Sequence, residues 1–268
     1  MNCKKPLKST ITAHSLPDVK GSTSIKILAG CVLIGMIAFS ASLFFSERVS
    51  NDAIGSARAA VSEYLNLHPN EEPPHYLAVV DYTRPSFRKR MVIIDMATGA
   101  ESWYHIAHAK KTGTTHARFF SNIKGSNMSS LGLFKTGISY LGDHGLAIRL
   151  HGLDSLKNSN AFTRDIVLHS AEYVSVPIII ENILTLNGPR LGRSNGCFVV
   201  NPSKIQEVVQ KLSRGGFIYA YGEEGLGKKR DKSQESRDER IFLQSFPCLT
   251  RESIRIAVTA WMPDHPVK

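Results

Sequence analysis

Residues 192–221 read GRSNGCFVVNPSKIQEVVQKLSRGGFIYAY, and the order of features in this stretch decides the fold. A turn rich in small residues ends at Cys197, and three strand-forming residues follow at 198–200. A cysteine at this point would be held between a tight turn and a strand. The stretch therefore predicts a side chain in a fixed position rather than one on a mobile loop.

A helix and a second strand complete this stretch. Asn201 is a suitable N-cap, Pro202 suits the first helical position, and Gly215-Gly216 ends the helix. The apolar stripe of the helix consists of Ile205, Val208, Val209 and Leu212. The run at 217–221 is typical of a strand. Turn, strand, helix and strand are thus expected in that order.

The preceding region is mainly β-like. Strand-like runs occur at 76–82, 91–96, 102–107, 146–150 and 166–169. Between the third and fourth runs, residues 109–130 are rich in Gly, Ser, Thr, Lys and Asn and predict a long loop, a kind of loop that is usually functional or disordered. Residues 75–222 therefore predict a mostly β domain of the α+β class with one clear helix.

The N-terminal region contains an apolar run. Residues 27–45 carry no charge, and their length is close to the roughly 20 residues that cross a hydrocarbon core. Five lysines precede the run, and few basic residues follow it directly. The positive-inside rule then predicts a cytoplasmic basic tail at 1–26, a transmembrane signal-anchor at 27–45, and export of the remainder. The expected location is the inner (cytoplasmic) membrane, crossed once, with the domain on the periplasmic or extracellular side.

Two processing alternatives remain open. Small residues at 38–42 resemble a signal-peptide cleavage site, which would release the protein into the periplasm. Residues 28–31 spell a lipoprotein box, but the apolar run follows its cysteine instead of preceding it.

Three further segments flank the domain. Residues 46–74 predict a stalk and linker, with a helix at 51–67 that the prolines of 68–74 break. Residues 223–240 form a charged linker without an apolar face. Residues 241–268 form a tail in which 254–258 alternates like a strand.

The net charge of +10 attracts the chain to anionic surfaces. No helix-turn-helix, zinc finger or aromatic-basic RNA signature is present, so nucleic acid is not an expected partner. Anionic lipids and acidic wall polymers satisfy the same charge, and so does solubility alone. The four cysteines form no CxxC pair, which argues against a zinc or redox motif.

Cys197 is a candidate nucleophile. A cysteine thiol has a pKa of about 8.5 and needs a neighbouring base, usually His, to react at neutral pH. The tetrahedral oxyanion also needs backbone N–H donors, which a tight turn supplies. Gly196 permits an unusual backbone angle next to the thiol. The alternative is a structural role, because a lone buried cysteine is usually a small hydrophobic residue, and Cys248 is open to the same interpretation.

The turn Ser194-Asn195-Gly196-Cys197 resembles the Ser-x-Gly-Cys signature of the L,D-transpeptidase superfamily, and residues about 104–222 are similar to its branch called the murein L,D-transpeptidase catalytic domain family. The matching pieces run in order: Phe120-Ser121-Asn122, Gly125-Ser126, Ser129–Gly132, Tyr140–Gly145, Leu150–Asp154, Asn160-Ala161, Arg164–His169 and Tyr173–Ser175. The resemblance implies a β-sandwich or barrel-like catalytic domain that needs no metal or organic cofactor.

The resemblance also implies roles for individual residues. Cys197 would be the acylated nucleophile and His169 its base. Gly196 and Ser194 would shape the turn, with backbone amides forming the oxyanion hole. Substrate-binding roles would fall to Arg193, Arg164 and Tyr173. The implied substrate is the peptidoglycan stem peptide, and an acceptor amine or water would resolve the thioester.

Two departures from the superfamily pattern stand out. Val199 lies where an Arg or Asn is common, so substrate anchoring must come from elsewhere. His169 and Cys197 are 28 positions apart, which makes 173–190 an insertion, interpreted as a lid.

Competing hypotheses remain. The same site could act as an L,D-carboxypeptidase. The chain could instead be a non-catalytic peptidoglycan-binding membrane protein. A zinc peptidase would use the histidines between His105 and His169, but their spacing matches no HExxH motif. Of these histidines, His151 is interpreted as structural and His144 as part of a turn that could contact substrate.

Overall fold

A computed structural model describes residues 22–45, 49–213 and 215–223. Helix α1 spans Ser22–Phe45 and includes the apolar run. Within these described residues, no helix has both the length and the apolar character required to span a membrane. The transmembrane helix predicted at 27–45 is thus not found. Cys248, the possible strand at 254–258 and nearly all of the charged run at 223–240 lie outside the described residues.

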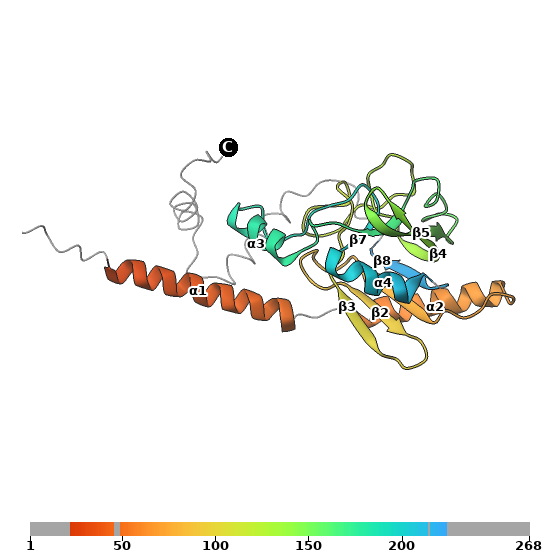
Figure 1. Cartoon of the computed structure of the whole chain (residues 1–268), viewed down its shortest axis with the longest axis horizontal. Helices are drawn as coiled ribbons and strands as arrows, with labels where there is room; N and C mark the ends of the chain where they lie inside the picture. Colours follow the sequence, from red (N-terminus) through yellow and green to blue (C-terminus); the bar gives the residue numbers. More distant parts are fainter. Residues whose placement is uncertain (1–21, 46–48, 214, 224–268) are drawn as a thin grey trace, which may run out of the picture.

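The domain is built mainly from strands, as predicted (Figure 1). The strands are β1 (Tyr76–Asp81), β2 (Met91–Asp95), β3 (Glu101–Tyr104), β4 (Gly132–Gly142), β5 (Gly145–Gly152), β6 (Val167–Ser170), β7 (Phe198–Val200) and β8 (Phe217–Tyr221). The helices after α1 are α2 (Asn51–Leu67), α3 (Val176–Leu184) and α4 (Ile205–Leu212), with a 3-10 turn at Pro202–Lys204. The predicted turn–strand–helix–strand order of 192–221 is confirmed.

The eight strands form one mixed sheet in the order β3-β2-β1-β8-β4-β5-β6-β7. The β1–β8 and β6–β7 pairs are parallel, and the other pairs are antiparallel. The chain leaving β3 then returns to β7, where the Ala107 N–H donates to the Val199 carbonyl at 2.9 Å. The two ends of the sheet therefore meet, which gives a barrel-like closure beside Cys197.

Helices cover opposite faces of the sheet. Because strand side chains alternate in direction, Ala78 and Val80 pack with α4, while Leu77 and Val79 pack with α2. The α4 stripe is buried as expected, and the Asn201 side chain accepts from the Ser203 N–H at 2.8 Å as a cap. Burial of these apolar side chains on both faces supplies most of the driving force for folding.

Helix α2 belongs to the domain and does not form the stalk expected at 46–74. Its small residues Ala53 and Ala57 are fully buried against the sheet, together with Val61. Ser50 caps the helix and donates its Oγ–H to Asp81 Oδ2 at 2.9 Å, which ties the helix start to the end of β1. The helix predicted at 51–67 is confirmed, but its packing was not foreseen, because alanines give a narrow apolar stripe that is easily mistaken for a solvated helix.

Candidate active site

Cys197 ends a turn that is stabilised by the side chain of Ser194 within the same turn. The Ser194 Oγ–H donates to the Cys197 carbonyl at 2.8 Å, and the same oxygen accepts from the Gly196 N–H at 3.2 Å. Gly196 has a φ of +147°, and a Cβ there would lie 2.6 Å from Ile166 Cδ1. The backbone angle therefore favours glycine at this position, and a side chain there would also displace the end of Ile166.

The thiol of Cys197 lies against the segment that precedes β6. Its Sγ–H donates to the Asp165 carbonyl at 3.5 Å. Asp165 has a φ of 54°, a left-handed conformation that Asp tolerates better than most residues. Burial raises the pKa of the Cys197 thiol above its ordinary value, although the Val167 N–H and the Arg164 charge oppose this. At neutral pH the thiol is therefore protonated, and it needs a base to become a nucleophile.

His169 lies on β6, with one ring nitrogen engaged by the backbone. Its Nδ1 is 2.9 Å from the Ser170 carbonyl, which can only accept, so Nδ1 carries the proton and Nε2 keeps its lone pair. Burial lowers the pKa of His169, and the neighbouring His144 lowers it further. The His144 ring stacks on the His169 ring with 4.9 Å between centroids. His169 is thus neutral at neutral pH and able to accept a proton.

The pairing of β6 with β7 brings His169 beside the turn that ends at Cys197. His169 pairs with Val199, and Cys197, which directly precedes β7, packs against the cluster that contains Val199. In this structure Sγ donates to the Asp165 carbonyl.

Arg164 and Arg193, two of the predicted substrate-binding residues, are engaged with the protein. Nη1 of Arg193 donates to the carbonyls of Lys110 and Gly113 at 3.3 and 3.1 Å. Among the residues that the structure describes, the terminal nitrogens of Arg164 donate only to oxygens of residues 121–130. Their sequence-predicted role at a substrate carboxylate therefore requires these contacts to be released, or shared in the case of Arg193.

Tyr173 lies close to the thiol and packs against Gly192. A Cβ on Gly192 would meet the Tyr173 ring at 2.6 Å, and the Gly192 N–H donates to the Tyr173 carbonyl at 2.9 Å. Burial and the charge on Cys197 raise the pKa of Tyr173 to about 12, so its hydroxyl stays protonated and can donate a hydrogen bond.

The insertion predicted as a lid folds onto the core next to Val199. Within it α3 buries Ile179 in a cluster with Val199 and Leu191, and Asn182 Nδ2 donates to the Arg190 carbonyl at 3.1 Å. Val199 itself is fully buried. An apolar side chain in this position packs α3 against the sheet and cannot anchor a substrate.

The remaining histidines contact separate partners. His105 lies 3.1 Å from the Phe87 carbonyl, and His151 stacks on Phe162. His108 is bound to Arg90 and to the Gly113 carbonyl. Across 22–45, 49–213 and 215–223, no group of three or more His, Cys, Asp or Glu side chains is placed to hold a metal ion.

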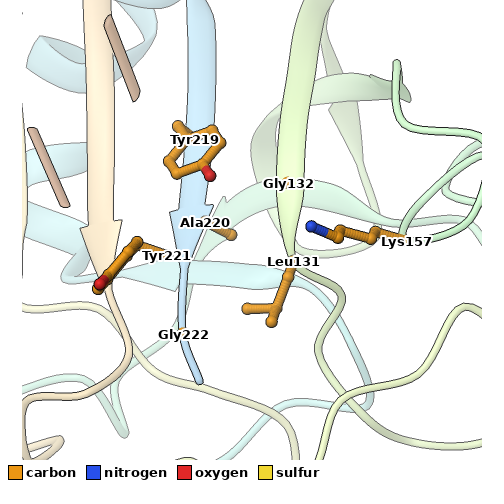
Figure 2. A pocket seen from close by; sticks show the side chains of 7 residues that line it. All are labelled: Leu131, Gly132, Lys157, Tyr219, Ala220, Tyr221 and Gly222. Atoms are coloured by element: carbon orange, nitrogen blue, oxygen red, sulfur yellow. The ribbon is translucent and has the colours of Figure 1, made fainter. Parts of the chain in front are cut away.

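A cavity of about 240 Å³ lies beside the ends of β8 and β4 (Figure 2). Lys157 and the strand residues Tyr219 and Tyr221 contribute side chains to it, with Gly132 and Gly222 among its lining residues. None of the residues predicted for catalysis or substrate binding lines this cavity. The candidate site is therefore the β6–β7 face around Cys197.

Sequence reasoning missed two contributions to this site. His144 was interpreted as part of a turn, because nothing in its local sequence indicates that the β4–β5 hairpin brings it onto His169. The carbonyl of Asp165 was also missed, since a backbone contact leaves no signal in a side-chain pattern. The only available clue to Asp165 was its place one residue after Arg164 in the quoted motif.

Comparison with protein families adds to this geometry. The family model described as the L,D-transpeptidase catalytic domain matches residues 47–221, which is more than half of the 268 residues and includes α2. Comparison with curated proteins gives no match. The family match covers the whole sheet and the Cys197 turn. The chain therefore belongs to the L,D-transpeptidase catalytic domain family, whose members modify peptidoglycan.

Proposed function

We propose that this protein is an L,D-transpeptidase acting on peptidoglycan stem peptides, with Cys197 as nucleophile and His169 as base. The observation that carries the proposal is the pairing of β6 with β7, which brings His169 beside the turn that ends at Cys197, with Nδ1 of His169 held by the Ser170 carbonyl. Family membership supports the reaction class and the substrate class.

The protonation states favour general base catalysis over a preformed thiolate–imidazolium pair. Burial raises the pKa of Cys197 and lowers that of His169, so both groups are neutral before reaction. Nε2 of His169 takes the thiol proton as Sγ attacks the carbonyl carbon of an L-centre-to-D-Ala bond. The proton then passes to the leaving amine as that bond breaks, and a thioester remains on Cys197.

An acceptor amine resolves the thioester. His169 removes a proton from the attacking amine, a new amide forms, and the thiol is regenerated. If water attacks instead, the product is a shortened stem peptide with a carboxylate, which is L,D-carboxypeptidase activity. The chemistry on the enzyme is the same in both cases, so the products decide between the two activities.

The oxyanion in this mechanism requires donors at the turn. The Gly196 N–H already donates to Ser194 Oγ, so its use at the oxyanion would require this bond to be shared or given up. The N–H of Cys197 is therefore the principal donor in the proposal. Ser194 acts by fixing the carbonyl of Cys197, which in turn orients the peptide bonds of the turn.

The proposal places the domain outside the cytoplasm, in the periplasm or at the extracellular face, because peptidoglycan lies there. The uncharged run at 27–45 and its preceding lysines support export. Protection of residues 49–223 from externally added protease in intact spheroplasts would contradict this placement.

The test uses the full chain, a carbapenem and defined muropeptides. Intact mass followed by peptide mapping should find one opened lactam on Cys197, and muropeptide products should show exchange or loss of the terminal D-residue. The Cys197→Ser variant should give neither result, whereas Cys31→Ser is the matched control and should give both. A folded wild-type protein without adduct and without product would indicate a non-catalytic peptidoglycan-binding protein and would overturn the proposal.

A further inference from the structure

Arg164 has an unusual set of partners for a half-buried cation. Its Nη1 donates to the Ser121 carbonyl at 2.7 Å and to Ser130 Oγ. Its Nη2 donates to the Met128 carbonyl at 2.7 Å and to Ser126 Oγ at 3.2 Å. All four terminal N–H groups are thus used by neutral oxygens of one loop. The planar guanidinium of Arg164 therefore has no pair of N–H donors left to bind both oxygens of a substrate carboxylate.

No carboxylate neutralises this guanidinium among the residues that the structure describes. The adjacent Asp165 carboxylate is 85% exposed, and its oxygen lies 3.9 Å from Arg149 instead. Removing a charge from water without an opposite charge is costly. A cation kept in such a place is stabilised whenever an anion forms beside it.

The guanidinium lies next to the nucleophile turn. A Cβ on Gly196 would be 3.6 Å from Nη2 of Arg164 and 3.6 Å from the Met128 carbonyl to which that nitrogen donates. Arg164 and the loop at 121–130 thus pack directly under the Gly196–Cys197 peptide. The group at this position that gains negative charge, as its proton is removed, is the sulfur of Cys197.

We infer that Arg164 is a positioning residue that clamps the loop at 121–130 under the Cys197 turn and supplies the positive charge facing the thiolate. This role replaces the substrate-carboxylate role that the sequence suggests. The inference rests on the proposed function only in taking Cys197 as the nucleophile.

The other groups around the thiol do not supply this positive charge. The Asp165 charge raises the pKa of Cys197, which is the opposite effect. Tyr82 and Tyr173 are kept neutral by pKa values of about 12. His169 is neutral because its pKa is lowered. The Val167 N–H is a donor without net charge. Arg164 is thus the cation that lowers the pKa of the thiol against the effect of burial.

The experiment measures the rate of iodoacetamide alkylation of Cys197 against pH in the full chain, by peptide mass. Alkylation reports the thiolate fraction and needs no turnover. In Arg164→Gln we expect the inflection of the curve of alkylation rate against pH to move up by about one pH unit. This shift corresponds to roughly tenfold less thiolate near neutral pH. In Arg164→Lys, which keeps the charge, the inflection should stay within about a third of that shift.

Two controls separate charge from loop anchoring. Arg193→Gln removes a cation bound to the Lys110 and Gly113 carbonyls, and should leave the inflection unchanged. Ser130→Ala loosens the clamped loop but keeps the guanidinium, and should also leave the inflection in place while increasing hydrogen exchange at 121–130. This variant provides the decisive comparison if Arg164→Gln does not fold.

An unchanged inflection in folded Arg164→Gln would overturn the inference, and so would equal shifts in Arg164→Lys and Arg164→Gln or a full shift in Ser130→Ala. An absence of muropeptide turnover together with the expected shifts would contradict the proposed function and leave the role of Arg164 intact. The two proposals therefore fail separately.

Discussion

Two buried histidines, His108 and His169, differ in how many ring nitrogens the protein engages. Arg90 Nη2 donates to His108 Nδ1 at 2.8 Å, so Nδ1 is unprotonated and Nε2–H donates to the Gly113 carbonyl at 3.2 Å. Within residues 22–45, 49–213 and 215–223, the one ring nitrogen of His169 that is engaged is Nδ1, by the Ser170 carbonyl. Burial lowers the pKa of both residues. The difference in function is therefore expected from the remaining lone pair and not from the pKa.

The two environments also differ in what surrounds the ring. His108 lies in a network with the fully buried Arg90, whose guanidinium lies over the Tyr82 ring at 5.1 Å. The backbone carbonyl of His108 accepts a hydrogen bond from the Ser194 N–H at 3.0 Å, and this bond supports the turn that ends at Cys197. His169 is stacked by His144 from a hairpin tip. The first region therefore holds the site in shape, and the second provides a proton acceptor.

The largest expected effect comes from His169→Gln. Glutamine approximates the size of the ring but cannot take a proton, so kcat/KM should fall about 10³-fold, within the range for loss of a general base. The thermal midpoint should change little, since few contacts of His169 are lost. Turnover of defined muropeptides and a circular dichroism melt give both values. Activity within tenfold of wild type would show that another group is the base.

A second large effect is expected from His108→Leu, this time on stability. The variant leaves the buried Arg90 without one of its acceptors, and the free energy of unfolding should fall by about 2–3 kcal/mol. Urea denaturation measures this loss. The double variant Arg90→Met with His108→Leu is the control, because removal of both partners should cost less than the sum of the single changes. Additive losses would contradict a coupled pair.

The next effect is the dependence of stability on pH. Folding lowers the pKa of His108 below the ordinary value of 6.5, so in acid the unfolded chain binds more protons than the folded one. The contribution of His108 to stability is therefore fully present above pH 6.5 and is lost as the pH falls below that value. His105, with a pKa of about 4, behaves in the same way. The thermal midpoint should decline from pH 6.5 toward pH 4, and less steeply in His108→Leu than in wild type. Equal slopes would exclude His108 as a contributor.

Much of the fold follows from sequence patterns. The 192–221 stretch was predicted in order because caps, prolines and glycines mark each boundary within a few residues. The strand β4 was missed, since Gly132–Gly142 contains three glycines and its far half is mostly exposed. Helix α3 was also missed. It packs Ile179 against Val199, and a contact between such distant segments leaves no local pattern in the sequence.

The candidate site was predictable as a list of residues but not as an arrangement. Cys197 and His169 follow from chemistry and from family resemblance. The partners of Arg164 do not, because serine hydroxyls and backbone carbonyls of a 121–130 loop carry no distinctive pattern. For the same reason the buried pair of Arg90 and His108 could not be found, since its members are 18 positions apart, one just before β2 and the other in the segment after β3.

The smallest predicted effect concerns His144 and sharpens the comparison of the two histidines. The charge of His144 lowers the pKa of His169 by repulsion. The stacked ring of His144 lowers the same pKa by excluding water. In His144→Ala the pKa of His169 should rise, so the acidic limb of kcat/KM should move to higher pH by about half a unit. His144→Phe keeps the stacked ring without the charge and should shift the limb less. An acidic limb that does not move in His144→Ala would mean that this limb reports a group other than His169.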